Sequence, residues 1–153
     1  MFTIFCTAKP FKNHNRIIQL NAIRSWTLLR PRPEILLFGD EEGYEGIAQE
    51  LGLRHISDIE RNEYGTPLLS SMFPKAQELA TTPLICYVDA DIILMEDFIQ
   101  AVKHVTDRKG SFLVTGQTMS LDIDSSVAFE DPTWEQGLRE RALSSGKTHG
   151  SWW

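Results

Sequence analysis

The sequence predicts a single α/β domain with a mostly parallel sheet flanked by helices. Short apolar runs alternate with helix-like patterns along the chain, as in repeated βαβ units. A length of 153 residues suits one domain with a sizeable core. The composition, 42% hydrophobic and 24% charged, is that of an ordinary globular protein.

Five apolar runs have the length and residue types of strands. Each is rich in β-branched, aromatic or leucine side chains and is bounded by polar, glycine or proline residues. The run before Asp89 is the most apolar of them. The predicted strands cover residues 2–7, 34–38, 53–56, 84–88 and 112–116.

Helices are predicted between the strands because apolar residues recur there three or four positions apart. The alternation of arginine and proline after Leu29 ends the first helix, and Gly52 ends the second. Pro74 should kink the third helix or divide it into two short ones. In the last, Asp131 is the expected N-cap with Pro132 at the first helical position. The predicted helices cover residues 16–29, 44–51, 68–80 and 95–105, with a fifth from Asp131 onward.

In parallel α/β sheets, ligands bind beyond the carboxyl ends of the strands. The first predicted strand ends at a loop whose backbone amides could meet a nucleotide and whose lysine could offset phosphate charge. A generic polar loop is the alternative. This loop consists of Thr7, Ala8, Lys9 and Pro10.

Asp89-Ala90-Asp91 follows the most apolar strand and is the principal candidate site. Residues two apart on a strand point to one face, so both carboxylates can converge on one cation. Hard oxygen ligands suit Mg²⁺ or Mn²⁺, and diphosphate oxygens and water would complete the coordination. Apolar runs flank the motif on both sides, and ionised groups buried there would be costly unless paired or metal-bound.

Other candidates depend on weaker signals. Asp40 ends the second strand and could accept hydrogen bonds from a base or ribose, although turn aspartates are common there. Arg61 could approach a diphosphate, although most such arginines are solvated. Gly65 and Thr66 share its polar loop, and Lys75 and His149 are weaker candidates still.

Charge and segment composition exclude several classes. The net charge is −6 and no basic run occurs, which disfavours a nucleic-acid partner. An anionic ligand would need a bridging cation or local amides instead. No apolar run approaches the ~18 residues of a transmembrane helix. The first residues enter a strand pattern without a signal-peptide pattern, so a cytoplasmic location is expected, with Cys6 and Cys86 as free buried thiols.

Two segments carry a family resemblance. Phe-Thr-Ile-Phe-Cys-Thr-Ala-Lys-Pro-Phe at residues 2–11 resembles the first nucleotide-binding strand and loop of GT-A nucleotide-diphospho-sugar transferases, of the glycosyltransferase family 2 kind. Tyr-Val-Asp-Ala-Asp-Ile-Ile-Leu at residues 87–94 resembles their DxD strand. The resemblance implies a Rossmann-like GT-A sheet that binds a UDP- or GDP-type sugar through Mn²⁺ or Mg²⁺ and transfers the sugar to an acceptor hydroxyl.

The same resemblance implies roles for individual residues. Asp91 corresponds to the direct metal ligand, Asp89 to a ribose or second metal contact, and Asp40 to the acidic residue that meets the base. Such enzymes are usually longer, so we expect residues 1–153 to be a nucleotide-sugar-binding domain that is incomplete at its C-terminus. The acceptor half would begin near Gln117, Asp122 and Asp124. Whether the acceptor is a sugar, lipid or protein stays open, and no catalytic base is assigned.

Two alternatives to glycosyl transfer remain open. A haloacid-dehalogenase-like phosphotransferase would use Asp89 as a nucleophile. That motif usually lies on the first strand and has Thr or Val where this chain has Ile93. The chain could also be a non-catalytic nucleotide-sugar-binding fragment. A sugar nucleotidyltransferase is disfavoured because residues 7–15 lack glycine, and the P-loop pattern is absent.

Overall fold

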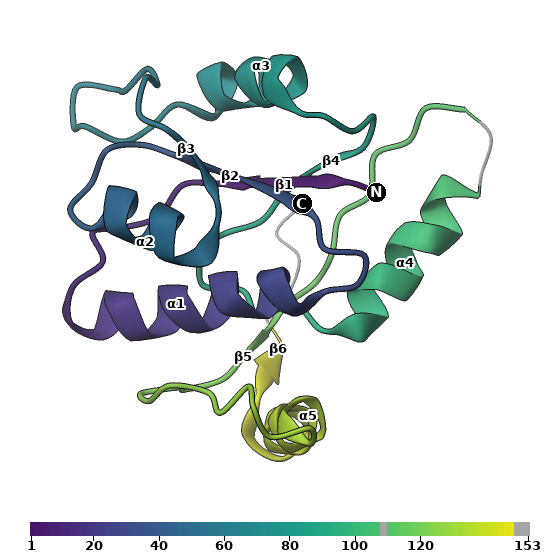
Figure 1. Ribbon diagram of the computed structural model, residues 1–153. Coiled ribbons are helices and arrows are strands. Elements are labelled where there is room, and N and C mark those ends of the chain that lie inside the picture. Colours follow the sequence, from purple (N-terminus) through teal and green to yellow (C-terminus); the bar gives the residue numbers. More distant parts are fainter. Residues whose placement is uncertain (108–109, 149–153) are drawn as a thin grey trace.

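The computed structural model describes residues 1–107 and 110–148. Strands and helices alternate through the first 106 residues, and a small peripheral unit follows (Figure 1). The order of elements is β1 (Thr3–Cys6), α1 (Asn13–Leu28), β2 (Glu34–Phe38), α2 (Tyr44–Leu51), β3 (Arg54–Ile56), α3 (Leu69–Leu79), β4 (Ile85–Tyr87), α4 (Glu96–Thr106), β5 (Met119–Ser120), α5 (Trp134–Ser145) and β6 (Lys147–Thr148).

The main sheet is parallel and has the strand order β3-β2-β1-β4. Thr3 of β1 pairs with Glu34 on one side and with Ile85 on the other. All four residues of β1 are buried, because helices cover both faces of a parallel sheet. The α/β class and the first four predicted strands are confirmed, with ends that differ by one residue at most.

Two apolar layers sandwich the sheet. Helices α1, α2 and α4 lie on one face, and α3 lies alone on the other (Figure 1). Trp26 of α1 is fully buried in the larger layer, and its indole N–H donates to the carbonyl oxygen of Ile92 at 2.8 Å. Phe5, Met72 and Ala76 belong to the smaller layer beneath α3. Each helix therefore buries its apolar side chains in one of the two core layers.

The order in which strands are added to the sheet reverses after β3, although all four strands are parallel. The chain passes from β1 to β2 and β3 in one direction, and α3 then carries it back past β1 to β4. This arrangement creates a topological switch point, beyond which ligands bind in open α/β sheets. Because the strands are parallel, the carboxyl ends of β1, β2 and β4 lie at the same edge.

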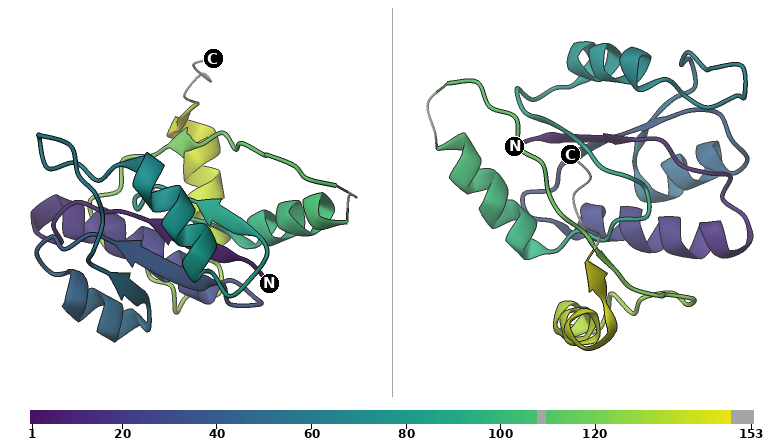
Figure 2. Two further views of the ribbon diagram at one scale, coloured as in Figure 1. Left: turned by 90° about the horizontal axis from the view of Figure 1, so that it is seen from above. Right: turned by 180° about the vertical axis from the view of Figure 1, so that it is seen from behind.

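The C-terminal elements form a small unit beside α1 (Figures 1 and 2). Strands β5 and β6 pair antiparallel, and α5 lies next to them. Asn21 of α1 anchors the preceding loop by donating to the carbonyl oxygen of Ser125 and accepting from the N–H of Val127, both at 2.9 Å. Arg139 of α5 also forms an ion pair with Asp97 of α4 at 3.0 Å.

The prediction of a strand at residues 112–116 is wrong. This segment belongs to no strand in the described part of the chain, and its Leu113 is 91% exposed. The handedness of crossover connections disfavours a parallel strand at this place. Because α4 packs on the same face as α1, a parallel strand reached through α4 on the outer side of β4 would need a left-handed crossover.

Two further details of the predicted helices can be compared with the structure. Of the two outcomes predicted at Pro74, the division into two short helices does not occur, because α3 is one helix that contains Pro74. Helix α5 begins at Trp134 with Thr133 as N-cap, two residues after the predicted cap. Asp131 still accepts hydrogen bonds from the N–H and hydroxyl of Thr133, in the turn that precedes the helix. The predicted end of α2 is confirmed: Gly52 adopts the left-handed conformation with φ 64°.

Among residues 1–107 and 110–148, no helix has the length and apolar character needed to cross a membrane.

A polar network at the amino edge joins β1, β2 and the loop before β4. Glu34 Oε2 accepts hydrogen bonds from Thr3 Oγ1 at 2.7 Å, from Thr81 N–H at 2.8 Å and from Thr81 Oγ1 at 3.0 Å. Arg54 approaches the other carboxylate oxygen at 3.5 Å. Burial raises the pKa of Glu34, but the bonds from Thr81 and Thr3 and the charge of Arg54 outweigh it, so the net pKa is lowered.

The lowered pKa of Glu34 predicts an acid-sensitive fold. The unfolded chain holds this proton more tightly, so the stabilisation is present above the ordinary glutamate pKa of about 4.3 and is lost as the pH falls below it. Urea unfolding of Glu34→Gln should give a flatter loss of stability between about pH 5 and 3 than the wild type. Parallel pH profiles for the two proteins would contradict this assignment.

Candidate functional site

Three loops meet at the carboxyl edge of the sheet. They follow β1 at residues 7–10, β2 at residues 39–41 and β4 at residues 88–91. In the last of these, Val88 and Ala90 are buried whereas Asp89 and Asp91 are exposed. The N–H of Ile92 donates to the carbonyl oxygen of Asp89 at 3.0 Å, so the motif forms a turn rather than a continuation of the strand.

The exposure of both aspartates corrects one argument made from the sequence. The apolar residues around the motif do not bury the two carboxylates, because the chain leaves the strand and turns at Asp89. Desolvation therefore creates no need for a cation here. Because β4 ends at Tyr87, the strand rule from which convergence of the two carboxylates was predicted does not apply to this turn either. Position remains: two solvent-facing carboxylates, two residues apart, lie at the switch point.

Tyr87 lies beside both aspartates. Its hydroxyl donates to Asp89 Oδ1 at 2.8 Å. Burial, this hydrogen bond and the negative charges of Asp89 and Asp91 all raise the pKa of Tyr87. Burial, with a smaller effect of Asp89, raises the pKa of the Cys6 thiol to about 12. The N–H of Val88 donates to the carbonyl oxygen of Phe5 at 3.2 Å, so the acid pair, Asp89 and Asp91, follows a residue bonded to the end of β1, where the nucleotide-binding loop was predicted.

The donor set at Asp89 and Asp91 is small. Across the described ranges, no three or more His, Cys, Asp or Glu side chains are grouped as a metal site would require. The chain offers two hard carboxylate ligands at this position, and these suit Mg²⁺ or Mn²⁺ when a ligand's oxygens and water fill the other positions. A cation at this place fits an anionic ligand rather than a closed structural site.

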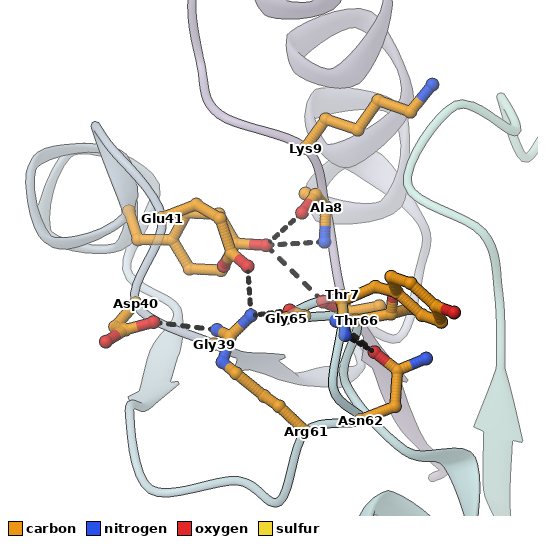
Figure 3. A network of polar contacts seen from close by, with 12 residues as sticks. Thr7, Ala8, Lys9, Gly39, Asp40, Glu41, Arg61, Asn62, Gly65 and Thr66 are labelled. Atoms are coloured by element: carbon orange, nitrogen blue, oxygen red, sulfur yellow. Dashed lines mark hydrogen bonds and ion pairs between the residues drawn. The ribbon is translucent and has the colours of Figure 1, made fainter.

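Internal hydrogen bonds use most of the loop after β1 (Figure 3). The Tyr44 hydroxyl accepts from the N–H of Ala8 at 2.6 Å and donates to the carbonyl oxygen of the same residue at 2.5 Å. Gln19 Oε1 accepts from the N–H of Lys9 at 2.6 Å. The amides of Ala8 and Lys9, which were predicted to meet a nucleotide, therefore already have internal partners, and Pro10 has no N–H to offer. The exposed Lys9 side chain remains available at this edge.

Arg61 connects the loops after β2 and β3 (Figure 3). Its guanidinium donates to Asp40 Oδ1, to Glu41 Oε1 and to the carbonyl oxygen of Gly65, each at 2.7 Å. Two predicted site residues, Asp40 and Arg61, are thus brought together as an ion pair. Since two carboxylates offset its charge, Arg61 is committed to these partners and does not stand as a free diphosphate ligand.

Glu41 belongs to this cluster but was not predicted from the sequence. Burial raises the pKa of Glu41, but the hydrogen bond and charge of Arg61 outweigh it, so the net pKa is lowered. Its second oxygen, Oε2, is buried without a hydrogen-bond partner in the described structure. The only sequence signal was the acidic run Asp-Glu-Glu after Gly39, and nothing in that run distinguishes Glu41 from Glu42.

The remaining candidates have structural partners or lie apart. Asn62 Oδ1 accepts from the N–H groups of Tyr64 and Thr66, which folds the loop that carries Gly65. Lys75 Nζ binds Asp58 Oδ2 at 2.6 Å. Gln117, Asp122 and Asp124 are exposed, and His149 lies outside the described residues.

One cleft of about 450 Å³ opens beside Asp40 rather than beside Asp89. His55 lies within it, and its Nε2 is 2.6 Å from the carbonyl oxygen of Gly39. A second hollow of about 260 Å³ lies between α5 and the loop before it. Asp40 lines the first cleft, whereas Asp89 and Asp91 do not, so the two aspartates and this cleft are separate features of the carboxyl edge. The residues around the first cleft are Asp40, Glu41, Gly43, Tyr44, Glu45, Gly46 and His55.

No protein-family model, no curated protein and no solved structure matches this chain.

Gly39 is required where the second strand meets this cluster. It has φ +123°, and a Cβ there would collide with Glu41 Oε2 and lie 3.1 Å from the Tyr44 ring. Gly39→Ala should lower the free energy of unfolding by about 1–3 kcal/mol in urea titrations. Gly46→Ala is the control, because open space surrounds that helical position and alanine should stabilise it by about 0.5–1 kcal/mol. Equal effects at both positions would contradict the crowding at Gly39.

Arg61 should contribute more to the stability of the fold than an exposed surface arginine does, because it forms ion pairs with Asp40 and Glu41. Arg61→Met would leave the half-buried Glu41 carboxylate without its cation, so urea unfolding should show a loss of about 1–3 kcal/mol. Lys12→Met removes an exposed ion pair with Glu42 and should change stability by less than about 0.5 kcal/mol. If Arg61→Met is as mild as Lys12→Met, the cluster does not hold the two loops together.

Proposed function

We propose that this chain binds a UDP- or GDP-type nucleotide-diphospho-sugar at the carboxyl edge between β1 and β4, as the donor site of a GT-A-type glycosyltransferase. The observation that carries the proposal is the placement of Asp89 and Asp91. Both carboxylates face solvent at the switch point of a parallel sheet, in the turn that follows the pairing of Tyr87 with Phe5 at the end of β1.

The chemistry of the ligand follows from the charge at this edge. Asp89 and Asp91 would repel a diphosphate unless a divalent cation lay between them and it. Asp89 and Asp91 would hold that cation, which neutralises charge on the nucleoside diphosphate when bound. The exposed ammonium of Lys9, on the neighbouring loop, adds a positive charge on the same edge.

The second loop offers a different contact. Arg61 engages Asp40 through Oδ1, while 67% of the Asp40 side chain remains exposed. Asp40 can therefore accept a hydrogen bond from a base or ribose while its orientation is held by Arg61. In this proposal Arg61 positions Asp40 instead of binding the diphosphate itself. The sugar would pass to an acceptor hydroxyl that attacks the anomeric carbon as the nucleoside diphosphate leaves.

Calorimetry with UDP and GDP sugars tests this proposal. In the presence of Mn²⁺, Asp91→Asn and Asp89→Asn should each weaken nucleotide-sugar binding at least about tenfold, because each removes one of two carboxylate ligands. Glu78→Gln is the matched control. It removes one exposed charge near the end of α3, at the opposite edge of the sheet, and should bind as the wild type does.

Two results would contradict the donor site. Binding that is equally tight without divalent cation, or unchanged in both aspartate variants, would remove the acid pair from the site. A phosphoryl group found on Asp89 by mass spectrometry after incubation with a phosphomonoester would favour the phosphotransferase instead.

A further inference from the structure

An exposed aromatic surface adjoins the acid pair. Phe73 of α3 is 42% exposed, although it lies over the sheet. Its ring centroid is 4.9 Å from that of Phe5 on β1 and 5.9 Å from that of Tyr87 on β4. Tyr87 in turn donates to Asp89 Oδ1 at 2.8 Å. An unbroken chain of contacts therefore leads from the Phe73 ring to the proposed cation ligand.

Topology places this surface at the ligand-binding edge. Helix α3 connects the carboxyl end of β3 to the start of the parallel strand β4, so its first half lies near the carboxyl edge. Phe73 is the fifth residue of α3 and lies in that half. Helix α3 lies on the sheet face opposite to α1 and α2 (Figure 1), and Phe73 packs against Phe5 on that face.

The core does not account for the exposure of Phe73. Met72 and Ala76 already fill the space between α3 and the sheet and are fully buried. The Phe73 ring packs edge-on against Phe5, with an interplanar angle of 87°, and leaves much of its area in solvent. Ligand-binding sites combine aromatic area with a few polar groups that fix orientation, and both kinds of group occur here in Phe73 and Asp89.

We propose that Phe73 and Tyr87 form the surface on which the sugar ring of the donor rests. This inference rests on the proposed function and extends it to a named sugar-binding surface. A pyranose ring presents C–H groups on its faces, which suit an aromatic ring, and hydroxyls at its rim, which suit the adjacent carboxylates.

Connectivity favours the sugar over the nucleobase as the occupant. The sugar is bonded directly to the diphosphate, whereas the ribose separates the base from it. Since Tyr87 touches Asp89, the aromatic surface begins one contact away from the position proposed for the diphosphate. The base would extend toward Asp40, on the other side of β1.

The test compares a nucleotide sugar with its own nucleoside diphosphate. Calorimetry would use UDP-glucose with UDP, and GDP-mannose with GDP, all in Mn²⁺. Phe73→Leu should weaken the sugar nucleotide about three- to tenfold, the range expected for an aromatic contact, and leave the nucleoside diphosphate within twofold. Phe73→Tyr keeps a ring and should restore the difference. Phe112→Leu is the control, because Phe112 is also 42% exposed but lies in the segment after α4.

The outcomes separate this inference from the proposed function. Equal weakening of UDP and UDP-glucose in Phe73→Leu would place the base on the ring and overturn the sugar assignment. Unchanged binding of both ligands would overturn the aromatic surface while leaving the donor site intact. Absence of any cation-dependent nucleotide binding by the wild type would overturn the proposed function, and this inference with it. Tyr87→Phe keeps the ring without its hydroxyl and should retain the preference for the sugar nucleotide.

Discussion

The structure depends on the pairing of β1 with a parallel strand on each side. Thr3–Cys6 is wholly buried, and its neighbours β2 and β4 run in the same direction. Because β1 is central, the loop that follows it lies between the Gly39–Asp40 turn and the Asp89–Asp91 turn. The switch point arises from the same pairing, since β2 and β4 are reached by crossovers on opposite faces.

Polar contacts then hold the loops at this edge in one arrangement. Tyr44 bonds both backbone groups of Ala8, and Arg61 joins Asp40, Glu41 and Gly65 (Figure 3). These contacts order the loops without a ligand. In the proposed function, such preorganisation would lower the entropy cost of binding. Asp89 and Asp91 differ from this cluster because no basic side chain within residues 1–107 and 110–148 forms an ion pair with either of them.

Local pattern predicted the sheet because each of its four strands is a short apolar run with clear boundaries. Residues 112–116 have the same apolar pattern but form no strand. A parallel strand beside β4 would need a left-handed crossover through α4, which is rare. Sequence reasoning named Arg61 and Asp40 separately and gave both to the ligand. It could not show that an Arg61 guanidinium nitrogen lies 2.7 Å from Asp40 Oδ1, because 20 residues, which include α2 and β3, separate the two residues in the chain.

The amino-acid sequence by itself determined the α/β class, the strand and helix positions to β4, and the presence of two aspartates at a strand end. These features depend on residues close together in the chain, where apolar periodicity and turn chemistry act directly. Only the tertiary structure decided that Asp89 and Asp91 are exposed. It also decided that Arg61 forms ion pairs with Asp40 and Glu41, and that the rings of Phe73 and Tyr87 are in contact. Each of these facts depends on which strands become neighbours and which face a helix covers, and no local pattern carries that information.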